Sequence, residues 1–188
     1  MIFVTAAARK DKAQIAPHTG DDELASSAAS GDVAALGALY DRYAPALMAV
    51  AYRLLMSRSD AEDVLHDVFV GLPEALRRYE ERGALASWLK RVTVRVALSR
   101  MRREEARDAI TLDAALAAPS RDVAASIDLE VAVASLPSSL RTVLLLKEVE
   151  GYSHAEIAEV VGISVAASKV RLHRALRALR TLLEERER

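Results

Sequence analysis

Residues 62–67 hold four side chains that can bind cations or exchange protons. Glu62 and His66 are four residues apart, as are Asp63 and Asp67, so a helix would gather all four on one side. This spacing suits a metal site, but no second cluster of ligands accompanies it. A solvated acidic face, or an acidic surface that binds a positively charged partner, explains the pattern better. We therefore expect no metal and no cofactor.

Candidate catalytic groups are scarce in the rest of the chain. There is no cysteine, which excludes a thiol nucleophile, a cysteine-based zinc site and a disulfide framework. We expect His154 and His173 on a helix surface or facing a DNA groove, and not in catalysis. The sequence therefore predicts a binding protein and not an enzyme, with no small-molecule substrate.

Residues 151–175 have the features of two helices joined by a tight turn. Ser153 and Glu156 stand at capping-box spacing, and Gly162 can end the first helix in the left-handed conformation. Ser164 can cap the second helix. This pattern predicts a helix-turn-helix whose second helix enters the major groove of DNA. The residues expected at or near the groove are Ser164, Ala166, Lys169, Val170, His173 and Arg174.

Charge is segregated along the chain, although the net charge is only −1. Residues 60–74 contain five acidic residues and no Lys or Arg, whereas residues 77–107 contain ten basic and four acidic residues. Residues 169–180 contain five basic residues and no acidic one. These counts predict one acidic helix and two basic surfaces suited to nucleic-acid phosphates.

Apolar spacing predicts an all-α fold. Apolar residues recur at helical intervals over 33–55, 64–72 and 85–98, with a kink expected at Pro45 and a bend or end at Pro73. Ser59 and Glu62 predict a capping box for the second of these helices. No segment has the alternating pattern and turn residues of paired strands.

The pattern divides the chain into two small helical domains joined by a flexible linker. We expect a flexible leader at 1–20, a first domain at 21–103, a linker at 104–127 and a second domain, with the helix-turn-helix, at 128–188. Neither a secretion signal nor a long apolar run is present. A cytoplasmic protein without membrane insertion is the expectation.

Residues 31–184 resemble the bacterial RNA polymerase sigma factors of the small, two-domain extracytoplasmic-function group. The motifs that carry the resemblance are LYDRYAP at 39–45, DAEDVLHDVF at 60–69, ASWLKR at 86–91 and the two-helix segment at 151–175. Their order and spacing, together with the acidic and then basic charge pattern, make the resemblance specific.

The resemblance implies a subunit that gives core RNA polymerase its promoter specificity. Residues 21–103 would be sigma region 2, which docks on the clamp helices of the largest polymerase subunit and holds the proximal promoter element as a single strand. Residues 128–188 would be region 4, which meets the flap region and binds the distal element. An anti-sigma factor would hold the protein inactive.

By the same resemblance, four residues of the acidic helix would bind polymerase: Asp63, His66, Asp67 and Phe69. The residues implied at the proximal promoter element are Tyr79, Ser87, Trp88, Lys90, Arg91, Arg95 and Arg100. Trp88 is also a candidate core residue, with part of its ring in a base pocket.

The chain departs from the pattern of the group at a few positions. Ser168 and Val170 exchange the usual apolar and polar residues, so we expect the Ser168 hydroxyl to face the core and bond to the carbonyl of Ser164. Val170 could then touch a thymine methyl group. Pro73 and Arg95 also replace commoner residue types, which leaves the promoter sequence open.

Two other functions stay open at this point. A sigma mimic would occupy an anti-sigma factor and never bind promoters, but the retained Lys90, Arg91, Lys169 and Arg174 disfavour it. A stand-alone helix-turn-helix repressor would leave the acidic helix unexplained.

Overall fold

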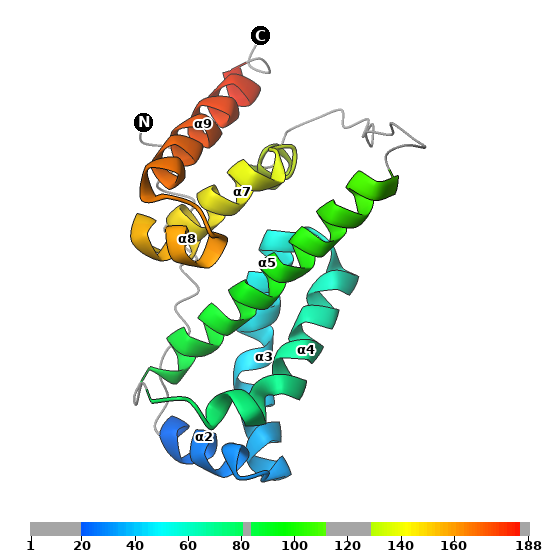
Figure 1. Cartoon of the computed structure of the whole chain (residues 1–188), viewed down its shortest axis with the longest axis vertical. Helices are drawn as coiled ribbons and strands as arrows, with labels where there is room; N and C mark the ends of the chain where they lie inside the picture. The colour runs from blue at the N-terminus through cyan, green and yellow to red at the C-terminus, as the bar shows by residue number, and fades with distance from the viewer. Residues whose placement is uncertain (1–19, 81–83, 112–128, 185–188) are drawn as a thin grey trace. The chain divides into compact units, whose positions relative to one another are not determined.

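The computed structural model describes residues 20–80, 84–111 and 129–184, and every regular element in these ranges is a helix (Figure 1). The predicted all-α fold is confirmed. The helices are α2 (Asp21–Ala29), α3 (Val33–Leu55), α4 (Arg58–Leu76), α5 (Leu85–Thr111), α6 (Leu129–Ala134), α7 (Ser138–Leu144), the π-helix η1 (Leu145–Val149), α8 (His154–Val161) and α9 (Val165–Glu184).

The chain forms two compact units, and the boundary between them falls after Met101, within α5. The predicted leader, apart from Gly20, and most of the predicted linker lie outside the described residues. The first eight residues of that linker, 104–111, are helical and continue α5. Glu104, Glu105, Ala106 and Arg107 are good helix formers, so loss of the apolar repeat there does not end the helix.

In the first unit, α2, α3 and α4 pack on one another. The buried face of α3 contributes Leu39, Leu47 and Leu54, and that of α4 contributes Val64 and Leu72, all with at most 1% of their surface exposed. These side chains recur at intervals of seven or eight residues, which is about two helical turns, so each helix presents one apolar stripe to the shared core.

A buried carboxylate ties α2 to α3. Asp21, the first residue of α2, accepts a hydrogen bond from the Tyr43 hydroxyl and pairs with Arg42 at 2.6 Å. Burial, together with the bond to Asp21, raises the pKa of Tyr43. The paired guanidinium offsets the cost of burying the carboxylate.

Both interior prolines are tolerated within helices. α3 runs through Pro45, and α4 continues past Pro73 to Leu76. Of the two outcomes predicted for Pro73, a bend or an end of the helix, the end is therefore wrong. A proline removes one helical hydrogen bond, whereas the turn that follows it buries Leu76. Burial of that apolar side chain favours continuing the helix.

The cap of α4 is Ser57 and not Ser59. The Ser57 hydroxyl accepts a hydrogen bond from the backbone N–H of Asp60 at 3.4 Å. Met56 adopts the left-handed conformation, with φ 55°, so the chain turns there and Arg58 is already helical. Glu62 accepts a hydrogen bond from Arg58 Nε at 2.9 Å, and the predicted capping box from Ser59 to Glu62 is wrong.

In the second unit, α9 packs against α6, α7 and α8. Its core joins residues from both ends of the unit's sequence. The buried members are Ala132, Leu136, Leu144, Ala175 and Leu179. The buried side of α9 is thereby fixed, and with it the side that faces outward.

Candidate protein and nucleic-acid interfaces

The acidic surface, which we define as Glu62, Asp63, His66 and Asp67 of α4, is exposed as predicted from the sequence. Phe69 lies beneath it with 7% of its surface exposed. Its ring meets the ring of Tyr40 edge to face, with centroids 4.9 Å apart. Three of the four predicted polymerase-binding residues therefore reach the surface, and the fourth supports it from below.

An apolar groove adjoins the acidic surface. Val70 and Tyr40 are 68% and 47% exposed, and they line a hollow of about 540 Å³ with Leu36, Leu65 and Phe69, bordered by Glu62 and His66. This groove could not be predicted from the sequence, because it forms only where α3 and α4 lie side by side. The one signal available was Val70, an apolar residue off the buried stripe of α4.

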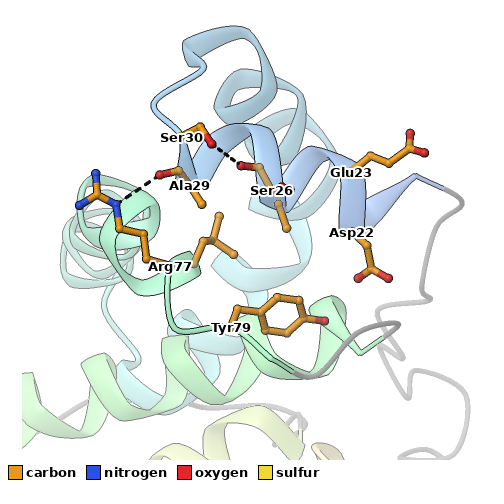
Figure 2. A pocket seen from close by; sticks show the side chains of 9 residues that line it. Asp22, Glu23, Ser26, Ala29, Ser30, Arg77 and Tyr79 are labelled. Carbon is orange, nitrogen blue, oxygen red and sulfur yellow. Dashed lines mark hydrogen bonds between the residues drawn. The ribbon is translucent and has the colours of Figure 1, made fainter.

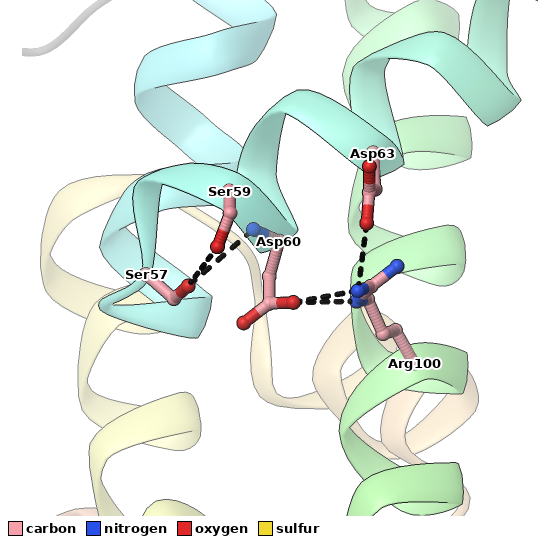
Figure 3. Close-up of polar contacts among 5 residues, drawn as sticks. All are labelled: Ser57, Ser59, Asp60, Asp63 and Arg100. Atoms are coloured by element: carbon pink, nitrogen blue, oxygen red, sulfur yellow. Dashed lines mark hydrogen bonds and ion pairs between the residues drawn. The ribbon is translucent and has the colours of Figure 1, made fainter.

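Arg100 joins the acidic helix to the basic one (Figure 3). Its guanidinium lies 2.6 Å from an oxygen of Asp60 and 2.8 Å from an oxygen of Asp63. Hydrogen bonds from Ser57 and Arg100 hold the pKa of Asp60 below its usual value, despite partial burial. Burial by itself lowers the pKa of Arg100. The hydrogen bonds to Asp60 and Asp63 and the negative charges of these carboxylates outweigh burial and raise that pKa above its usual value. A predicted DNA contact and a predicted polymerase contact therefore share one ion-pair cluster.

Two predicted residues of the proximal element, Tyr79 and Trp88, meet at the start of α5. The rings of Tyr79 and Trp88 have centroids 5.2 Å apart, and the Tyr79 oxygen accepts a hydrogen bond from the backbone N–H of Ala84 at 3.2 Å. Both aromatic side chains are half-buried. Further along α5, the remaining predicted residues are exposed (Ser87, Arg95) or half-buried (Lys90, Arg91).

Tyr79 also lines a polar pocket with α2 and the end of α4 (Figure 2). The pocket has a volume of about 540 Å³; α2 contributes Asp22, Glu23 and Ser26 to its lining, and the end of α4 and the segment after it contribute Arg77 and Tyr79. Arg77 Nε donates a hydrogen bond to the carbonyl of Ala29 at 3.3 Å. About fifty residues separate the two walls in the sequence, so the pocket could not be predicted from local sequence patterns.

The helix-turn-helix forms as predicted. Ser153 Oγ accepts from the Glu156 N–H at 3.2 Å, and Glu156 accepts in return from the Ser153 N–H at 2.7 Å. Gly162 ends α8 with φ 76°. Ser164 Oγ accepts from the Ala167 N–H at 3.0 Å and so begins α9.

The outward side of α9 contains every groove residue predicted for that helix. All five are exposed: Ala166, Lys169, Val170, His173 and Arg174. The helical spacing also predicts Val165 and Leu176 on the inward side, but they are 42% and 38% exposed, because the buried side centres on Ser168, Ala175 and Leu179.

Ser168 has a different hydrogen-bond partner from the predicted one. It is fully buried, and its hydroxyl is hydrogen bonded to Nδ1 of His154, at 2.9 Å. The predicted bond to the carbonyl of Ser164 is not the one the structure describes. That carbonyl accepts instead from the Ser168 backbone N–H at 3.0 Å, as in any helix.

No group of three or more His, Cys, Asp or Glu side chains in the described part of the chain is placed to hold a metal ion. None of the helices seen in these ranges has a stretch both long and apolar enough to cross a bilayer.

Comparison with known proteins assigns the two units. The family profile "Sigma-70 region 2" matches residues 39–107, and "Sigma-70, region 4" matches residues 126–179. RNA polymerase sigma factor CarQ of Myxococcus xanthus is 32% identical over 155 residues, which span 79% of this chain and 89% of CarQ. ECF RNA polymerase sigma factor SigE of Mycolicibacterium smegmatis is 29% identical over 171 residues, spanning 82% of this chain and 65% of SigE.

The chain therefore belongs to the extracytoplasmic-function sigma factors. The fold of this sigma factor also matches the solved structure of CnrH in complex with the cytosolic domain of CnrY, with 28% identity and a TM-score of 0.55. That match covers 88% of this chain and 98% of CnrH. The acidic surface and the start of α5 lie in the region 2 match, and the outward side of α9 lies in the region 4 match.

Proposed function

We propose that this sigma factor binds core RNA polymerase through the acidic surface of α4 and reads the distal promoter element through the outward side of α9. The separation of charge between these two exposed surfaces carries the proposal. Exposed carboxylates suit Arg-rich helices such as the clamp helices of the largest polymerase subunit. The basic helix α9, with Lys169 and Arg174 on its outward side, suits the major groove. The unit that contains α9 would also meet the flap region of polymerase.

Region 2 would hold the proximal element as a single strand. The Tyr79–Trp88 pair offers a stacking platform for an unpaired base. Lys90, Arg91 and Arg95 on the same helix suit the phosphate backbone that follows. Capture of an unstacked base offsets part of the cost of unpairing it, about a few kcal/mol. The protein itself would perform no covalent chemistry, so it acts as a specificity factor and not as an enzyme, in the cytoplasm.

We extend the proposal to an inhibitory partner. The relative CnrH is solved together with the cytosolic domain of CnrY, and the anti-sigma factor NepR accompanies the sigma factor RpoE of Bartonella quintana. In this chain, an anti-sigma factor would cover the acidic surface together with the basic residues of α5 and of the outward side of α9. It would thereby block the binding of polymerase and the binding of promoter DNA at once.

Run-off transcription with core polymerase and a promoter library tests the proposal. Specific transcripts should appear only when this protein is added. Asp67→Arg should reduce them at least tenfold, because a charge reversal on the acidic surface repels an Arg-rich partner. Asp41→Arg, an exposed charge reversal on α3, is the matched control and should leave transcription unchanged.

Two other outcomes would identify a different function. Binding to an anti-sigma factor with no transcript from any promoter would support the sigma mimic. Tight, specific binding of the isolated protein to duplex DNA, with no need for polymerase, would support a repressor.

A further inference from the structure

The hydrogen bond between His154 and Ser168 connects the two helices of the helix-turn-helix. Ser168 is on the inward side of α9 and has no exposed surface, so its hydroxyl needs a partner within the protein. Nδ1 of His154, at 2.9 Å, supplies it. Either neutral tautomer of the imidazole can make this bond, because Nδ1 donates in one and accepts in the other.

The backbone that carries His154 is itself fixed. His154 is the first residue of α8, directly after the cap residue Ser153. The two bonds of the capping box, 3.2 Å and 2.7 Å long, join Ser153 and Glu156 on either side of it. The imidazole is therefore presented to α9 from an anchored helix start.

Ser168 immediately precedes two of the predicted groove residues, Lys169 and Val170. Successive side chains on a helix are about 100° apart around its axis, so the place where Ser168 is held determines the direction in which Lys169 and Val170 point. Apolar packing is not directional, whereas a hydrogen bond is. A polar residue at this core position therefore restricts the rotation of α9 more closely than an apolar one would.

We propose that His154 is a positioning residue for promoter recognition. Its bond to Ser168 sets the rotation of α9 about its own axis, and thereby the bases that Lys169 and Val170 select. The proposal rests on the proposed function, in which α9 reads the distal element.

The test is the base preference of the holoenzyme on promoters with a randomised distal element, read by sequencing the run-off transcripts. The variants are His154→Leu, His154→Asn, Ser168→Ala and the double variant His154→Leu/Ser168→Ala. A preference is a ratio between promoters measured with the same protein, so a smaller folded fraction does not change it. Ser168→Ala only removes an oxygen atom and keeps the experiment informative if His154→Leu folds poorly.

We expect His154→Leu and Ser168→Ala to weaken the preference at the same distal positions, by roughly tenfold at the most affected one. His154→Asn places an amide group near the position of Nδ1 and should retain the preference. The double variant should be no weaker than either single variant, because both changes remove one bond.

Unchanged preferences in both single variants would overturn the proposal. The proposal would also be overturned if His154→Leu weakened the base preference by its full amount in the Ser168→Ala background. His154 would then act without Ser168, by contacting DNA directly. A wild-type holoenzyme with no distal preference would overturn the proposed function of α9, and this inference with it.

Discussion

The side chain of Arg100 lies between two carboxylates that have different roles. Asp60 is mostly covered, with 26% of its side chain exposed, whereas Asp63 is 61% exposed. One carboxylate oxygen of Asp63 is therefore paired with Arg100, while much of the side chain stays in contact with solvent. A polymerase cation that approaches Asp63 would share this carboxylate with Arg100, which weakens the hold on Arg100 without releasing it from Asp60.

The cluster predicts a specific dependence of stability on pH. Because the pKa of Asp60 lies below its usual value, its charged form stabilises the folded state above about pH 4, and that contribution is lost as the pH falls further. The free energy of unfolding should therefore fall more steeply from about pH 5 to pH 3 in the wild type than in Asp60→Asn. Urea titrations across this range measure it. Asp41→Asn, which removes one exposed charge, should retain the wild-type slope, and equal slopes in all three proteins would refute the assignment.

At the scale of helices, the chain's own capping residues predict α8 and α9 well but α4 less well. Ser153, Gly162 and Ser164 act locally, so their roles can be read from spacing alone. The start of α4 depends on Met56 in a left-handed conformation that residue type does not favour. The partners of Arg100 and Ser168 lie forty and fourteen residues away, and only the folded chain brings them together.

Two glycines in different backbone conformations predict opposite effects of the same substitution. Gly162 has φ 76° and open space around it, so Gly162→Ala should destabilise the second unit by about 1 kcal/mol through backbone strain alone. Gly37 lies within α3, also with open space, and Gly37→Ala should stabilise the first unit by about 0.5–1 kcal/mol through helix propensity.

Chemical denaturation followed by circular dichroism measures both changes. Gly37→Ala is the matched control for Gly162→Ala, because each adds one methyl group that meets no neighbour within 4 Å. Effects of the same sign would show that the backbone conformation at Gly162 is not what the cap requires.

Over the whole molecule, a net charge of −1 hides three strongly charged surfaces. These surfaces could be predicted from the sequence, because a run of like charges on a helix stays in solvent whichever other helix its apolar side packs on. The counts could not show that Arg100 and Asp63 neutralise each other in part. Local charge sums therefore overstate the basic character of α5 and describe the outward side of α9 more faithfully.

This charge distribution predicts the salt dependence of promoter binding. If Lys169 and Arg174 neutralise phosphates, the double variant Lys169→Ala/Arg174→Ala should lower the slope of log affinity against log salt by about two for the holoenzyme. Fluorescence anisotropy with labelled promoter DNA measures that slope. Arg58→Ala, an exposed cation on α4, should leave it unchanged. A lower affinity at an unaltered slope would assign the two residues to base edges instead.

The buried pairing of Asp21 also sets a limit on shortening the chain. A protein trimmed to begin at Gly20 would retain the carboxylate that Arg42 and the Tyr43 hydroxyl share. Removal of two more residues would delete that acceptor and leave the Arg42 guanidinium and the Tyr43 hydroxyl without it in the interior. Trimming into α2 therefore begins to weaken the first unit at the very first residue of that helix.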